Sequence, residues 1–108
     1  MRKVILPLSL ALGFFSFAQI ASAETATDTY KAKCAMCHGV DGNGSTPAGK
    51  AMKARDFHDA DVIKSSDADL IQAITKGRNK MPAYGTKLSE EQIKGLVAHI
   101  RDLEKSGK

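Results

Sequence analysis

The residues of this 108-residue chain whose types and spacing best suit chemistry form the run C-A-M-C-H, positions 34–38. Cys34 and Cys37 are three positions apart, so on a helix their thiols lie about one turn apart on the same side. Two thiols at that spacing can add to the two vinyl groups on one edge of a haem. His38 then lies under the ring as an iron ligand. The run therefore matches the C-x-x-C-H attachment signature of a c-type haem.

A pair of cysteines at this spacing can also serve other purposes. They can form a disulfide, a thioredoxin-like redox pair or half of a zinc site. The redox pair favours a βαβ context and the zinc site needs two more ligands, and the sequence shows neither. The histidine directly after the second cysteine is what haem attachment requires, so the pattern favours one covalently bound haem c.

The first 23 residues have the composition of an export signal. A short basic segment, Met1 to Lys3, precedes an apolar stretch from Val4 to Ile20, and Ala21-Ser22-Ala23 has the A-x-A form of a cleavage site. We expect residues 1–23 to be a cleaved secretory signal peptide and residues 24–108 to be a periplasmic domain. The alternative is an uncleaved membrane anchor, although the apolar stretch is near the lower length limit for spanning a bilayer.

The expected mature chain has 85 residues, enough for one small domain. Its aromatic residues are only Tyr30, Phe57 and Tyr84, and the chain has no tryptophan, so its own hydrophobic core must be thin. A haem would supply the missing apolar centre, and we expect the haem-free mature chain to be largely unfolded. With 14 basic and 12 acidic residues the mature chain has a formal net charge of +2, which gives no indication of nucleic-acid binding.

Helical periodicity dominates the mature chain. We expect a first helix over residues 25–37, and a second that Ser66 caps and Gly77 ends. A last helix starts at Ser89, with Gln92 as its capping-box partner. Its apolar stripe comprises Ile93, Leu96, Val97, Ile100 and Leu103.

The remaining segments read as connections. Residues 39–49 contain four glycines and predict a loop, and residues 78–86 predict another. Between them, residues 51–65 are weakly patterned, with a short helix possible over 59–64. Residues 104–108 are polar and are expected to fray. No segment alternates with period two, so the prediction is an all-α fold of three to four helices around one haem.

The sixth iron ligand must come from a distant residue. The methionine candidates are Met36, which lies inside the attachment motif and cannot reach across the ring, then Met52 and Met81. Met81 is favoured because it follows a terminated helix and Pro82 stiffens the backbone beside it. Ligation by His58 or His99, or an open sixth site suited to gas or peroxide chemistry, are the alternatives. The free nitrogen of His38 needs a carbonyl acceptor, for which the segment at Thr46 and Pro47 is the candidate.

These motifs and their order resemble the class I c-type cytochromes, in particular the small bacterial periplasmic kind. The resemblance rests on C-A-M-C-H near the mature N-terminus, G-V-D-G-N-G-S-T-P after it, K-M-P-A-Y late in the chain and the helix L-V-A-H-I-R-D-L. It implies that Cys34 and Cys37 are thioether anchors and that His38 and Met81 are the axial iron ligands. It also implies that the Pro47 carbonyl accepts the His38 ring N–H.

Two positions depart from the pattern of that family. Ala26 stands where a glycine is common at the helix crossing, and His99 stands where the last helix usually has an aromatic residue. Gly95 in the last helix is a candidate to restore the clearance. The resemblance also implies that Tyr30 packs on the last helix.

The function expected from these features is one-electron transfer between redox proteins by a monomeric carrier, with no enzymatic activity. The expected partners are electron donors and acceptors with acidic docking patches, and no stable membrane insertion is expected once the signal is cleaved. The alternatives are a haem enzyme or gas- or peroxide-responsive protein with a displaceable Met81, and an electron-entry subunit of a larger redox complex. Candidate propionate partners are Arg55, Arg78 and Asn79.

Overall fold

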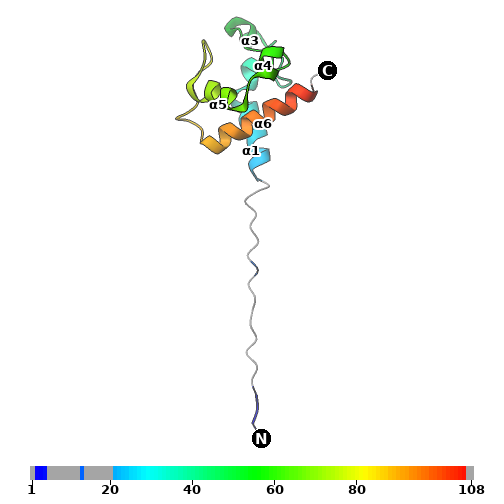
Figure 1. Cartoon of the computed structure of the whole chain (residues 1–108), viewed down its shortest axis with the longest axis vertical. Coiled ribbons are helices and arrows are strands. Elements are labelled where there is room, and N and C mark those ends of the chain that lie inside the picture. The colour runs from blue at the N-terminus through cyan, green and yellow to red at the C-terminus, as the bar shows by residue number, and fades with distance from the viewer. Residues whose placement is uncertain (1, 5–12, 14–20, 107–108) are drawn as a thin grey trace.

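The computed structural model describes residues 2–4, 13 and 21–106, and in this part of the chain all regular secondary structure is helical (Figure 1). Within it the only β-type pairing is an isolated bridge between Arg78 and Met81, so the expected all-α class is confirmed. The helices are α1 (Ala21–Lys33), α2 (Ala35–His38), α3 (Pro47–Met52), α4 (Ala60–Lys64), α5 (Asp67–Lys76) and α6 (Glu90–Ser106).

Most of the predicted signal peptide lies outside the described residues, so its cleavage stays a prediction. Helix α1 begins at Ala21, four residues before the expected start, and ends at Lys33, before the turn at Cys34. Among the helices that the structure describes, none has both the length and the apolar composition needed to cross a membrane.

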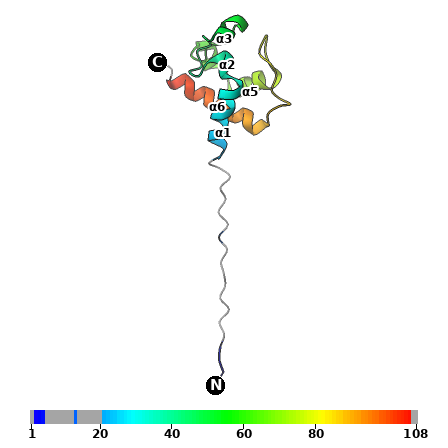
Figure 2. The same cartoon turned by 180° about the vertical axis from the view of Figure 1, so that it is seen from behind.

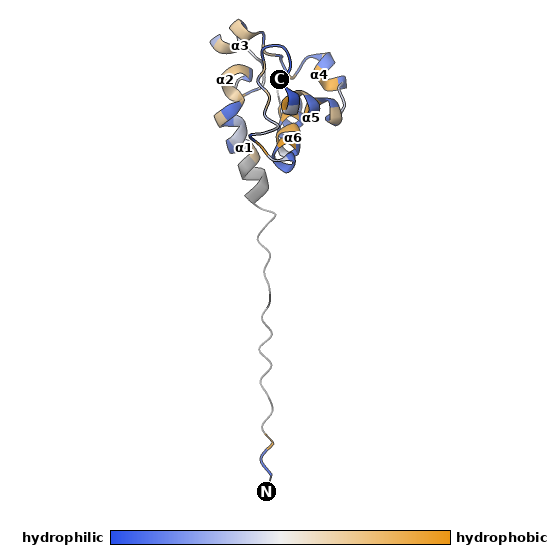
Figure 3. Ribbon diagram, turned by 90° about the vertical axis from the view of Figure 1, so that its left-hand side faces the viewer, coloured by the Kyte–Doolittle hydropathy of each residue, from blue (hydrophilic) through white to orange (hydrophobic). Residues whose placement is uncertain are grey.

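Helix α6 packs against both α1 and α5. It starts where the sequence predicted, after Ser89. Ser89 and Gln92 form a reciprocal capping box, because the Ser89 N–H donates to Gln92 Oε1 at 2.8 Å and the Gln92 N–H donates to Ser89 Oγ at 3.1 Å. In Figure 3 α6 carries both apolar (orange) and polar (blue) parts, as an amphipathic helix does. Ile93, Leu96 and Val97 are buried, together with Ile100 one turn later.

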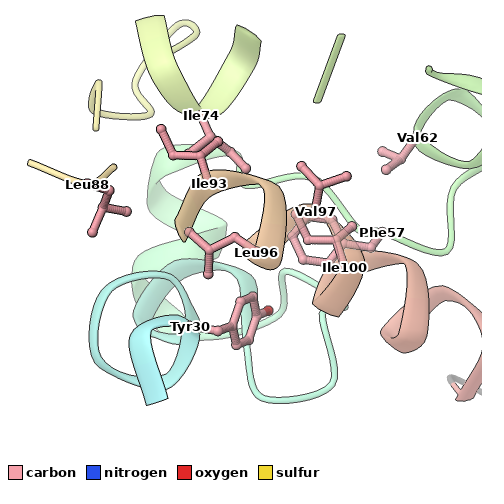
Figure 4. Packing of buried hydrophobic residues seen from close by; sticks show 9 residues of the cluster. All are labelled: Tyr30, Phe57, Val62, Ile74, Leu88, Ile93, Leu96, Val97 and Ile100. Carbon is pink, nitrogen blue, oxygen red and sulfur yellow. The ribbon is translucent and has the colours of Figure 1, made fainter. Parts of the chain in front are cut away.

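The crossing of α1 and α6 holds the two ends of the domain together (Figures 1 and 2). Tyr30 from α1 and Leu96 from α6 are each only 1% exposed, and both belong to the nine-residue core drawn in Figure 4. A Cβ added at Gly95 would lie 3.3 Å from the Ala26 Cβ. The missing side chain of Gly95 therefore provides the clearance at the crossing.

Two further sequence-based assignments are wrong, one at α3 and one at the end of α6. Helix α3 spans the end of the predicted loop, residues 39–49, and the start of the weakly patterned segment, residues 51–65, where no helix was expected. It forms because the Thr46 hydroxyl caps it by accepting the Gly49 N–H at 2.9 Å, and because Pro47 occupies its first turn. Helix α6 continues to Ser106, although fraying was expected from Glu104. Arg101 Nη1 donates to Glu104 Oε1 at 2.8 Å and fixes the last turns.

The short helix expected within residues 59–64 is present as α4, and α5 has the predicted cap. The Ser66 hydroxyl accepts the Asp69 N–H at 3.1 Å, and Gly77 ends the helix. Arg101 joins these two helices to α6, because its guanidinium donates to the carbonyls of Val62 and Ser65 and to the carboxylate of Asp67.

Candidate haem site

Cys34 lies at the junction of α1 and α2, and Cys37 lies within α2. The Cys34 N–H donates to the Tyr30 carbonyl at 2.9 Å, and the Cys34 carbonyl accepts the His38 N–H at 2.9 Å. Both thiols are free and half-buried. Burial raises the pKa of the Cys34 thiol to about 11. A redox-active pair needs the opposite shift, so this environment suits an attachment site better than a thioredoxin-like one.

His38 has the protonation state and the free nitrogen that a metal ligand needs. Its Nδ1 lies 3.1 Å from the Arg55 carbonyl oxygen, and because a carbonyl can only accept, the proton is on Nδ1 and the lone pair is on Nε2. Burial lowers the pKa of His38, which keeps the ring neutral. The expected acceptor was the Pro47 carbonyl. The contact with Pro47 stays a prediction for the haem-loaded protein.

The His38 ring is also held by stacking. The Phe57 ring lies with its centroid 4.5 Å from that of His38 and its plane at 24°. On the other side of the motif the Tyr30 hydroxyl donates to the Gly39 carbonyl at 2.7 Å in a buried bond. Sequence reasoning missed the contributions of Phe57 and the Arg55 carbonyl. The one available signal was that Phe57 is among the three aromatic residues of the expected mature chain.

Thr46 and Gly49 fasten α3 to the attachment motif. The Thr46 hydroxyl donates its proton towards the carbonyl oxygens of Met36, at 2.6 Å, and Cys37, at 3.0 Å, and it accepts the Gly49 N–H. A Cβ at Gly49 would overlap the Cys37 carbonyl oxygen, so only glycine allows α3 to approach this closely. The glycine-rich segment thus packs its backbone directly against the motif.

Met81 is presented by a tight, hydrogen-bonded turn. The Met81 N–H donates to the Arg78 carbonyl at 2.9 Å, and the Arg78 N–H donates to the Met81 carbonyl at 3.2 Å. Asn79 accommodates the turn with φ of +55°. At Gly77 φ is +75°, and a Cβ there would lie 2.7 Å from the Met81 carbonyl oxygen. Half-buried, the Met81 side chain packs against the core, as does Cys34.

The other ligand candidates have different surroundings. Met36 is 71% exposed and Met52 is 43% exposed. Both ring nitrogens of His58 are engaged, Nδ1 at 2.7 Å from Asp56 Oδ1 and Nε2 at 2.9 Å from the Leu103 carbonyl oxygen. The ring of His99 lies with its centroid 4.6 Å from that of Tyr30. Of these side chains, only Met81 combines a thioether with packing against the core.

The donor set at the motif fits a covalent haem. Two free thiols one turn apart, a neutral imidazole with Nε2 available and a thioether held in a closed turn are the groups that haem c attachment and ligation use. Across the described residues, no group of three or more His, Cys, Asp or Glu could hold a metal ion. The zinc alternative, which needs further ligands, has no support in this part of the chain.

Comparisons with known proteins agree with this site. Residues 21–100 match the family model described as cytochrome c oxidase, cbb3-type, subunit III. Cytochrome c6 of Pyropia yezoensis is 31% identical, with 99% of each chain covered. The cbb3-type oxidase subunit CcoP of Azospirillum brasilense is 34% identical over 77% of this chain, which spans only 29% of the length of that protein. Among solved structures, the KustC0563 c-type cytochrome has a TM-score of 0.67 and 37% identity, covering 73% of this chain and 96% of its own.

A small helical domain with this motif and these relatives is a monohaem cytochrome domain. The chain belongs to the class I c-type cytochromes, as the resemblance indicated. Membership of this family implies a covalently attached haem c at the cysteine pair, Cys34 and Cys37. The family consists of electron carriers, so the chain is not expected to catalyse a reaction of its own, and redox proteins are its expected partners.

Proposed function

We propose that this protein is an exported one-electron carrier whose single haem c is held by thioether bonds to Cys34 and Cys37, with His38 and Met81 as axial ligands. When bound, the haem supplies a reversible Fe(III)/Fe(II) couple. A thioether ligand opposite a histidine favours the ferrous state and raises the reduction potential. With both axial positions filled, no coordination position remains for a substrate, which distinguishes a carrier from an enzyme.

The observation that carries this proposal is the setting of Met81. Its backbone is closed by two hydrogen bonds to Arg78, and its side chain packs against the same core as Cys34. A fixed ligand changes little between oxidation states. The motif and the methionine turn would therefore act together as a rigid frame, which suits rapid electron transfer.

Charge supports a protein partner with an acidic surface. Lys31 and Lys33 are exposed at the end of α1, and Lys76, Arg78 and Lys80 are exposed before Met81. Together they would steer an acidic redox partner towards the site. Rates of electron transfer to such a partner should fall as ionic strength rises, and rates that ignore salt would contradict steering.

The test is Met81→Ala in the haem-loaded protein, with Met52→Ala as the matched control. We expect Met81→Ala to abolish the weak near-infrared sulfur-to-iron band of the ferric protein, to lower the reduction potential and to allow rapid CO binding to the ferrous form. Met52→Ala should leave all three unchanged. Loss of the band in Met52→Ala instead would assign the ligand to Met52. Rapid CO binding by the unmodified protein would favour a displaceable Met81 and a gas- or peroxide-responsive role.

The export part of the proposal has its own measurement. The intact mass of the purified protein should equal the chain beginning at Glu24 plus one haem. A mass that includes residues 1–23 would contradict cleavage and support the membrane-anchor alternative.

A second candidate function follows from the cbb3-type subunit III match. Since CcoP is named as an oxidase subunit, this chain could serve as the electron-entry module of a larger complex. Co-purification with an oxidase at fixed stoichiometry would favour that role, and migration of the protein at its own mass would favour the diffusible carrier.

A further inference from the structure

Tyr84 occupies a fixed place at the far end of the turn that presents Met81. Its N–H donates to the Ile74 carbonyl at 2.9 Å, and the next residue, Gly85, donates to Thr75 at 3.0 Å. The Tyr84 carbonyl accepts the Leu88 N–H at 2.9 Å. The backbone of Tyr84 is thus tied to the end of α5 on one side and to the start of α6 on the other.

The Tyr84 side chain connects this loop to the attachment motif. Its hydroxyl donates to the Lys33 carbonyl at 3.3 Å, a contact between residues 51 positions apart. Lys33 is the last residue of α1 and directly precedes Cys34, and carbonyls at a helix end lack partners within the helix. The ring is half-buried and packs against the core. Burial is the largest cause that raises the pKa of Tyr84, so the hydroxyl stays protonated and can donate to Lys33.

We propose that Tyr84 is a positioning residue for Met81, whose hydroxyl bond to Lys33 holds the methionine loop against the helix end that carries Cys34. The proposal rests on the ligation by Met81 proposed above. If the haem is attached at Cys34 and ligated by Met81, it links the end of α1 to the methionine loop. The Tyr84–Lys33 hydrogen bond is then a second, direct link between these two segments. Displacement of Met81 by another ligand would require the loop to move away from α1, and the Tyr84 bond opposes that movement.

The test is imidazole binding to the ferric, haem-loaded protein, since imidazole must displace Met81 to reach the iron. We expect Tyr84→Phe to bind imidazole about two- to tenfold more tightly, the change expected from losing one hydrogen bond that closes the site. The near-infrared sulfur-to-iron band should persist without imidazole, because the aromatic ring and the Met81 turn remain. Far-UV circular dichroism would show that the fold is retained.

Thr75→Val is the matched control. It also removes one hydroxyl from the segment that supports the loop, but that hydroxyl donates within α5, to the Ile71 carbonyl at 2.7 Å. Its imidazole affinity should equal that of the unmodified protein.

Unchanged affinity in Tyr84→Phe, or an equal gain in Thr75→Val, would overturn the role of Tyr84 while leaving Met81 as the ligand. Absence of the sulfur-to-iron band from the unmodified protein would overturn the Met81 ligation itself and this inference with it.

Discussion

At the scale of single residues, His99 places a titratable ring where the family usually has an aromatic residue, so its contact with Tyr30 can depend on pH. The imidazole stands at the α1–α6 crossing against Tyr30, with a ring-centroid distance of 4.6 Å and an interplanar angle of 47°. Partial burial lowers the pKa of His99. Asp102 acts in the opposite direction, and Lys31 adds to the lowering. Because burial disfavours the charged form of His99, protonation of this ring at low pH weakens the folded state.

We therefore predict a pH-dependent effect of His99→Phe. The pKa of His99 is lowered in the folded state, so the unfolded chain binds more protons as the pH falls below about 6.5, the ordinary histidine value. The stability contribution of neutral His99 is fully present above that pH and is lost as the pH falls through the folded pKa. In denaturant unfolding of the haem-loaded protein, the stability advantage of His99→Phe should grow between pH 7 and pH 5.

His99→Gln separates titration from ring packing. It should show the same flattened acid dependence as His99→Phe but lower stability at pH 7, because it loses the contact with Tyr30. A constant difference between His99→Phe and the unmodified protein across this pH range would contradict the assignment.

At the scale of elements, the crossing of α1 and α6 depends on one absent side chain. The Cβ that Gly95 lacks would lie 3.3 Å from Ala26, closer than ordinary van der Waals contact. A glycine inside a helix costs about 1 kcal/mol relative to alanine, so close approach of the two helices is what justifies it. In the family, a glycine is common at this crossing on the first helix. Here the first helix has Ala26 at that position, and the glycine, Gly95, is on the last helix instead.

Gly95→Leu should therefore push α1 and α6 apart. We expect a loss of about 1–3 kcal/mol in the free energy of unfolding of the haem-loaded protein, the usual cost of overpacking. Ala98→Leu is the matched control, since Ala98 is exposed on the same helix and its change should stay within about 0.5 kcal/mol. Equal losses in the two variants would show that the crossing does not depend on Gly95.

At the scale of the whole molecule, the protein core is small for the chain it must order. The buried hydrophobic residues of the described chain number nine, drawn from α1, α4, α5, α6 and the connecting segments. Cys34, Met81 and Tyr84 pack against this cluster but stay partly exposed. A domain of this size rarely gains more than a few kcal/mol from its core alone, so we expect the haem to contribute to folding as well.

The mature chain expressed without haem should accordingly be largely unfolded. Thermal unfolding followed by far-UV circular dichroism should show weak helix content and no cooperative transition, whereas the haem-loaded protein should unfold in a single step. Cys34→Ala/Cys37→Ala provides a form that cannot attach haem covalently. A sigmoidal transition from either haem-free form would contradict a structural role of the cofactor.

Local patterns in the sequence were enough to predict the family and most helices. The attachment signature is confined to five adjacent residues, and the caps at Ser66 and Ser89 act over three residues. The stripe along α6 is a property of one helix. Each of these features is determined by near neighbours, so a linear reading captures it.

The surroundings of His38 were decided by tertiary structure. The Arg55 carbonyl and the Phe57 ring reach His38 only after the intervening chain has folded back, and no local pattern encodes that approach. Likewise α3 depends on the Thr46 cap joining α2, and the end of α6 depends on Arg101. These contacts join segments whose meeting is set by packing of the whole core, which is why the sequence could propose ligand residues but could not predict the contacts that hold them.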